Sequence, residues 1–141
     1  MNEREFYTPY GWKGEKYGST QNLPRKEVAK RIKKEIEAKF PKLGVSVRSE
    51  FFSNGSAINI KVVSVPAGFR IMRKEVNAYG NASYPYMDAA KALLEALQRI
   101  ANQYRYDDSD GQIDYFNTNF YCTPEFAWEL RSKEEKELGV E

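Results

Sequence analysis

Residues 45–65 read VSVRSEFFSNGSAINIKVVSV, and this stretch decides the fold of the 141-residue chain. Its two halves alternate β-branched apolar residues with polar ones, as a strand with one buried face does. Asn54-Gly55 separates the halves, and this dipeptide between two alternating runs is a strong signal for a β-hairpin. We therefore predict an antiparallel hairpin with strands over 45–52 and 57–65, ended by Pro66 and Gly68.

An amphipathic helix is predicted directly before the hairpin, over residues 24–40. Val28, Ile32, Ile36 and Phe40 recur every four residues, so they share one face of a helix. A proline stands at each end of the segment, where it can open a helix and end one.

The other faces of this helix carry the cations that form a candidate binding site. Phosphate binding needs several cations on one face, which displace counterions. A solvated face is the alternative, because Glu27, Glu35 and Glu37 can pair with lysines at i,i+4 spacing. The candidate cations are Lys26, Lys30, Arg31, Lys33 and Lys34.

The chain after the hairpin holds two further helices and one further strand. The apolar residues of 68–76 fit neither the helical period of about 3.6 residues nor the strand period of two clearly. A helix with a broad apolar stripe follows Pro85, then a turn at 108–111, a strand over 113–122 and a last helix opened by Thr123-Pro124. The stripe of the middle helix comprises Met87, Ala90, Leu93, Leu94, Leu97, Ile100, Ala101 and Tyr104.

The element order predicts an α+β fold. A small, mainly antiparallel sheet, made of the hairpin plus one later strand, is expected to be covered by helices on one face. Residues 24–141 suffice for a single domain of this kind. Residues 1–23 are rich in Tyr and Gly and are interpreted as an irregular arm whose rings dock on that domain.

The composition excludes several chemistries. The chain has no histidine and one cysteine, Cys122. Ser-His-Asp and Cys-His catalysis are therefore excluded, as are zinc sites built on His or on several Cys. We predict a buried Cys122, a non-enzyme, no cofactor and no metal, with a metal-dependent hydrolase as the remote alternative.

The aspartates of residues 107–114 are interpreted as turn residues. Aligning Gly111 with the glycine of a calcium-binding loop puts Asp108, Asp110 and Asp114 at ligand positions. The first and last positions then fall on Tyr106 and Asn117, so the spacing fails. Asp and Ser instead shape turns by accepting backbone hydrogen bonds.

Two tyrosines complete the candidate site. Alternation along 113–122 puts Phe116 and Phe120 toward the core. Tyr115 and Tyr121 then lie on the opposite side or at the strand end, where they can stack on bases or contact a protein. Coverage of these rings by the N-terminal arm is the alternative.

Charge and hydropathy indicate the setting. Residues 107–141 hold ten Asp/Glu against three Lys/Arg, a net charge of −7. Because the whole chain has a net charge of +2, residues 1–106 carry +9. A basic surface of this kind suits nucleic acid or an acidic protein. There is no apolar run of membrane-spanning length and no apolar secretory signal, so we expect no membrane association and a cytoplasmic location.

The sequence resembles large polyvalent protein-associated domain 29, whose core pattern reads FP…FSVRS…GSSI.V. The similar segments here are Phe40-Pro41, Val45–Arg48 and Asn54–Ile60, and later Tyr106–Asp110, Asp114–Phe116 and Phe120-Tyr121. Val63–Pro66 stands where the family has W.DGP. The resemblance implies a protein of phages, plasmids and integrative elements, with no assigned reaction.

Two functions are expected on these grounds. The first is a non-catalytic accessory domain of a mobile element that binds nucleic acid or nucleic-acid-handling machinery through the basic helix. The alternative is a protein-binding inhibitor of a host defence system, of the anti-CRISPR or anti-restriction type.

Overall fold

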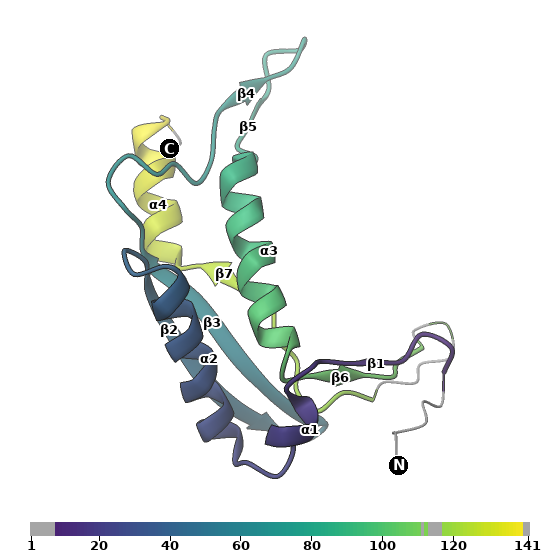
Figure 1. The fold of residues 1–141 in the computed structure, drawn as a ribbon. Coiled ribbons are helices and arrows are strands. Elements are labelled where there is room, and N and C mark those ends of the chain that lie inside the picture. Colours follow the sequence, from purple (N-terminus) through teal and green to yellow (C-terminus); the bar gives the residue numbers. More distant parts are fainter. Residues whose placement is uncertain (1–7, 111, 113–116, 140–141) are drawn as a thin grey trace.

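A computed structural model describes residues 8–110, 112 and 117–139, and its fold is α+β, as predicted. Its sheets are small and mainly antiparallel (Figure 1). In chain order the elements are β1 (Trp12–Lys13), α1 (Tyr17–Thr20), α2 (Arg25–Lys39), β2 (Gly44–Phe52), β3 (Gly55–Ser64), β4 (Glu75–Val76), β5 (Ala82–Ser83), α3 (Asp88–Asn102), β6 (Tyr106–Asp107), β7 (Glu125–Phe126) and α4 (Trp128–Glu137).

The predicted hairpin is confirmed as β2 and β3. Val47 lies opposite Ile60, and Phe52 lies opposite Gly55. The two loop residues are therefore Ser53 and Asn54, one position earlier than predicted. Gly55 ends the turn at a φ of 152°, a conformation that side chains rarely adopt, so glycine is needed at the first position of β3.

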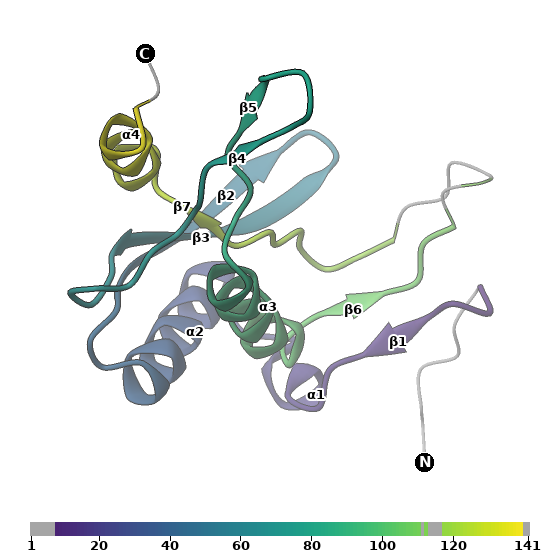
Figure 2. The same cartoon turned by 90° about the horizontal axis from the view of Figure 1, so that it is seen from above.

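Helices α2 and α3 lie on the same side of the β2–β3 hairpin (Figure 2). Both predicted apolar stripes face the core, which removes their apolar surface from water. The fully buried side chains include Ile32 and Ile36 of α2, Ile58, Ile60 and Val62 of β3, Leu97 of α3, and Phe120 and Phe126.

The third strand of the main sheet is β7, and the strand predicted over 113–122 is wrong for its described part. β7 pairs in parallel with Lys61 and Val62 of β3. Residues 117–122 make only single bridges, Thr118 with Asp107 and Tyr121 with Ala57. The last helix accordingly begins at Trp128, later than the predicted start at Thr123-Pro124.

Side-chain hydrogen bonds explain why residues 117–119 leave the strand pattern. Asn119 donates from Nδ2 to the Tyr104 carbonyl and accepts the Tyr106 N–H, both at 2.9 Å. The Thr118 hydroxyl donates to the Tyr106 carbonyl at 2.7 Å. Such side chains replace a sheet ladder with local bonds to backbone. Residues 113–116, with the predicted Tyr115 and Phe116, lie outside the described residues.

Residues 68–87, which include the ambiguous stretch 68–76, form an extended segment and a projecting hairpin of β4 and β5 (Figure 1). Asn77 Oδ1 accepts the backbone N–H groups of Tyr79 and Asn81, and Gly80 has a φ of 81°. The tip is therefore a defined turn whose left-handed residue requires glycine.

Residues 8–17 dock on residues 106–108, which include the first two aspartates of the turn. β1 pairs with β6, and Thr8 donates from its N–H and its hydroxyl to Asp108 at 2.8 Å. The rings of Tyr17 and Tyr106 meet edge to face at 5.2 Å. These contacts hold α1 beside the end of α3 (Figure 1).

Candidate nucleic-acid interface

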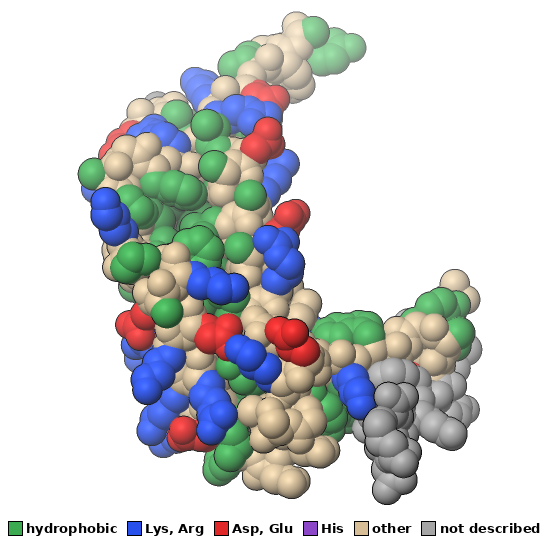
Figure 3. Space-filling model, in the orientation of Figure 1, with side chains coloured by type: hydrophobic (Ala, Val, Ile, Leu, Met, Phe, Trp, Pro, Cys, Tyr) green, Lys and Arg blue, Asp and Glu red, His purple; other side chains and the backbone are tan. Residues whose placement is uncertain are grey.

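Helix α2 presents an exposed basic face that faces neither the sheet nor α3. In Figure 3 several Lys and Arg side chains gather over the lower half of this helix. Among the residues that the structure describes, none of these cations has an acidic group within ion-pair distance. The exposed members are the predicted Lys26, Lys30, Arg31, Lys33 and Lys34, which we call the basic face.

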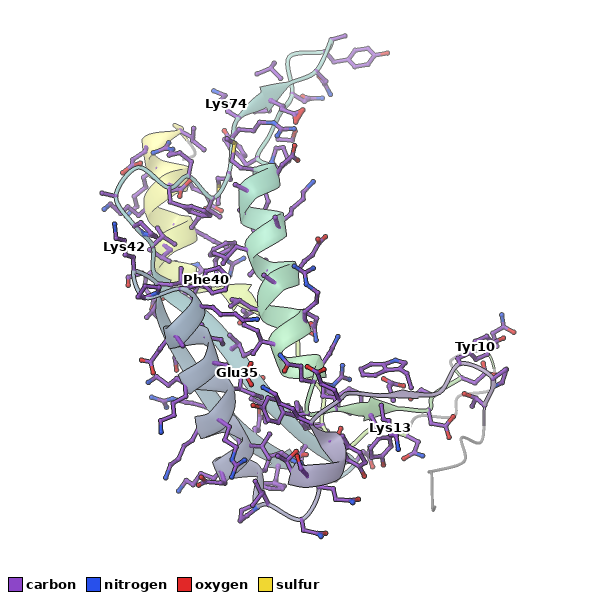
Figure 4. The ribbon with its side chains drawn as sticks, in the orientation of Figure 1. Tyr10, Lys13, Glu35, Phe40, Lys42 and Lys74 are labelled. Carbon is purple, nitrogen blue, oxygen red and sulfur yellow. The ribbon has the colours of Figure 1, made fainter. Side chains whose placement is uncertain are left out.

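Among the described residues, Glu27, Glu35 and Glu37 form no ion pair with the basic face, although the solvated-face alternative allowed such pairs. Glu35 is bound from outside its helix. Its carboxylate accepts hydrogen bonds from Lys16 Nζ, the Tyr104 hydroxyl and Gln103 Nε2. Glu35 lies on the side of α2 toward α3 (Figure 4). Lys16 therefore neutralises Glu35, and Glu27 and Glu37 are the acids of α2 that remain beside the basic face.

These contacts also set two pKa values. Partial burial opposes ionisation of Glu35, but the hydrogen bonds from Lys16 and Tyr104 outweigh it, and the pKa of the carboxyl is lowered. Burial, followed by the bond to Glu35, raises the pKa of Tyr104. The Tyr104 hydroxyl thus stays protonated and keeps donating.

A shallow hollow of about 670 Å³ lies against the basic face. Its lining holds four cations of the basic face, Lys30, Arg31, Lys33 and Lys34, two carboxylates, Glu27 and Glu37, and the buried Tyr104. The cations therefore outnumber the carboxylates by two. Cations around a concave surface attract anions more strongly than the same cations on a convex one, because the low-dielectric wall focuses the field.

Tyr121, the other described candidate, is exposed but lies on a different surface. It lies beside Ala57, on the sheet face opposite α2, and its ring stacks on Phe52 with centroids 6.1 Å apart. Sequence reasoning missed Phe52 and its neighbour Phe51 as exposed rings, although both follow directly after the polar Glu50 at the end of β2.

An apolar groove of about 500 Å³ forms a second concave surface. It lies where the end of α2, the start of β2 and α3 meet, with Phe40 and Lys42 at its border (Figure 4). Its lining is almost wholly apolar and includes Phe40, Leu43, Phe69, Ala92 and Leu93, with Lys39 and Lys42 at the rim.

The described aspartates act as turn residues. Asp107 accepts the Ser109 N–H and Asp110 accepts the Gln112 N–H, each two residues ahead. Asp108 is buried and bonded to Thr8. Within the described ranges no three acidic or thiol side chains come together as a metal site, and Asp114 lies outside these ranges.

Cys122 is buried, as predicted. Burial raises the pKa of its thiol to about 12, against a smaller opposing effect of Arg105. The sulfur is therefore a protonated core group at neutral pH, which is a poor nucleophile.

Residues 23–119 match the family described as large polyvalent protein associated domain 29, and the chain belongs to this family. The family is associated with polyvalent proteins of mobile elements. No curated protein and no solved structure matches the chain significantly. None of the helices described is both long and apolar enough to cross a membrane.

Proposed function

We propose that this protein is a non-catalytic accessory domain of a mobile element that binds nucleic acid through the basic face of α2. The observation that carries the proposal is the set of five exposed cations on one helix, none of which has an acidic partner among the described residues. An unpaired exposed cation can contact a phosphate without first breaking an ion pair, and each contact releases counterions.

The surroundings of α2 support the same function. Lys16 takes up the charge of Glu35, which otherwise lies within one helical turn of Arg31 and Lys34. The hollow beside Lys30 and Arg31 gives a backbone phosphate a concave surface to enter. The absence of histidine and the protonated, buried Cys122 support a binding role over nucleophilic catalysis.

Binding of labelled DNA and RNA oligonucleotides, measured by fluorescence anisotropy at low salt, tests the proposal. The variant Lys30→Gln/Lys33→Gln/Lys34→Gln removes three charges from the basic face. A control, Lys74→Gln/Lys91→Gln/Lys133→Gln, removes the same charge from exposed positions on other elements. We expect the first variant to lose at least about tenfold in affinity and the control to lose much less, since phosphate contacts are local.

Equal losses of affinity in the two variants would mean that binding depends on net charge alone and not on the basic face. If the wild-type protein binds no nucleic acid at low salt, the proposal is wrong. Circular dichroism of both variants checks that the exposed substitutions leave the fold intact.

The apolar groove favours a second candidate, a protein-binding inhibitor of a host defence system. The groove suits an apolar side chain from a partner, and Lys39 and Lys42 at its rim suit acidic neighbours of that side chain. Leu93→Asp places a charge in the groove. This candidate predicts that the wild type inhibits a purified defence nuclease or restriction enzyme stoichiometrically and that Leu93→Asp does not; inhibition by both would contradict it.

A further inference from the structure

We propose that the nucleic acid bound is single-stranded and that its bases stack on a second surface, made by Phe51, Phe52 and Tyr121, which we call the aromatic end. This inference rests on the proposed function, since the basic face supplies the phosphate contacts. It adds the strandedness of the ligand and the residues that contact its bases.

The aromatic end is a group of exposed rings at the turn of the β2–β3 hairpin. Phe51 is 72% exposed, Phe52 43% and Tyr121 41%. Phe52 and Tyr121 already lie nearly parallel, with an angle of 26° between the rings. Gly55 approaches both rings, since a Cβ there would lie 3.6 Å from each. The rings therefore have a fixed stacked arrangement without being covered.

The aromatic end adjoins the first turn of α2. Arg25 donates from Nε to the Ser56 hydroxyl and from Nη2 to the Asn119 carbonyl, at 3.1 and 2.9 Å. Ser56 is the register partner of Phe51, and Lys26 follows Arg25 as the first cation of the basic face. A chain of phosphates that follows α2 thus reaches the hairpin turn on the side of Phe51, and the stacked Phe52 and Tyr121 lie on the other face of the same turn.

The open face of the sheet continues this surface beyond the rings. Strand alternation puts Arg48 on the same face as Phe52, and Arg48 is exposed without an acidic partner among the described residues. Glu50 lies between Arg48 and Phe52 on this face and accepts a hydrogen bond from Asn59. Arg48 is the cation that a strand crossing the rings would reach next.

Exposed rings select single strands because every unpaired base offers a flat face, whereas the bases of a duplex already stack on one another. A protein contact is the other use of exposed aromatic side chains. The basic face at the same end of the molecule, whose cations have no acidic partner among the described residues, favours a polyanion.

Anisotropy titrations with a labelled single strand and with the same strand in a duplex test the inference. The variant Phe52→Ala/Tyr121→Ala removes the stacked pair, and Phe51→Ala serves as a milder second variant. Tyr79→Ala is the matched control, because Tyr79 is 90% exposed at the β4–β5 tip, away from both surfaces. Thermal unfolding of each variant verifies that it folds.

We expect tighter binding of the single strand than of the duplex by the wild type. The double variant should lose at least about tenfold in affinity for the single strand, with an unchanged dependence on salt, since stacking releases no counterions. Tyr79→Ala should bind as the wild type does.

Equal affinity for strand and duplex overturns the inference. A loss of affinity in the lysine variant alone, with the aromatic variants binding as the wild type does, also overturns the inference. That result assigns the rings to a protein contact, and the proposed function still stands. If no nucleic acid binds at low salt, both proposals fall together.

Discussion

Glu35 lies among the cations of α2 in sequence, yet its carboxylate is bound by side chains from outside the helix. Lys16 comes from the segment before α1, and Gln103 and Tyr104 follow α3. One acid thus ties three segments together and is withdrawn from the basic face, beside which Glu27 and Glu37 remain. The i,i+4 rule for helices gave the wrong partner because a tertiary donor competes better for a half-buried carboxylate than an exposed lysine does.

The pH dependence of stability follows from the lowered pKa of Glu35. A carboxyl whose pKa is lower in the folded state stabilises that state fully above its unfolded pKa of about 4.3, and this stabilisation is lost as the pH falls through the folded value. We therefore expect the free-energy difference of unfolding between wild type and Glu35→Gln to be largest near neutral pH and to shrink below about pH 4.3.

Urea unfolding of both proteins across that range measures the difference. A gap between wild type and Glu35→Gln that stays constant with pH would show that the ionised carboxylate contributes no more than an amide.

At the scale of elements, α4 is held by one buried acid. Glu134 accepts the backbone N–H groups of Ile71 and Met72 at distances of 2.8 to 3.1 Å. Glu134→Gln removes the charge and one acceptor oxygen, so we expect a loss of about 1–3 kcal/mol in the free energy of unfolding. Chemical denaturation measures this loss.

Glu135→Gln on the same helix is the control, with an expected change within about 0.5 kcal/mol. A similar small change for Glu134→Gln would mean that the extended segment at Ile71 does not depend on this carboxylate.

The segment before α1 makes close backbone contact with the end of α3. A Cβ on Gly14 would lie 2.0 Å from the Asn102 carbonyl oxygen, whereas nothing lies within 4 Å of one on Gly18. Gly14→Ala should therefore cost about 1–3 kcal/mol through steric overlap. Gly18→Ala, within α1, should be neutral or stabilising by up to about 1 kcal/mol.

Thermal and urea unfolding compare the two alanine variants. Equal stability of Gly14→Ala and wild type would contradict the close packing of this segment on α3.

The elements predicted correctly from sequence are those whose pattern is local. The hairpin, α2 and α3 each show a clean period in their own residues, and the five cations of the basic face follow from the helix alone. The strand predicted over 113–122 is wrong in its described part, 117–122, because alternation gives no sign that Asn119 and Thr118 bond to the backbone of Tyr104 and Tyr106. The Lys16–Glu35 and Phe52–Tyr121 contacts join distant residues, which no local period reveals.

At the scale of the whole molecule, the two ends differ in charge. The hairpin turn and the first turn of α2 lie at one end, and α4 lies at the other (Figure 1). The acidic excess of residues 107–141 includes Glu134, Glu135 and Glu137 of α4. Helix α4 itself is close to neutral, with four Glu against three Lys/Arg, whereas α2 has seven Lys/Arg against three Glu. A polyanion is therefore drawn more strongly toward the basic face than toward α4.

The salt dependence of single-strand binding tests nucleic-acid recognition by the basic face most directly. Three to five phosphate contacts give a slope of log K against log salt of about −2 to −3.5, and Lys30→Gln/Lys33→Gln/Lys34→Gln should reduce its magnitude by about 2. A measurable affinity with a slope near zero, or the same slope in the variant, would contradict the assignment of phosphate binding to α2.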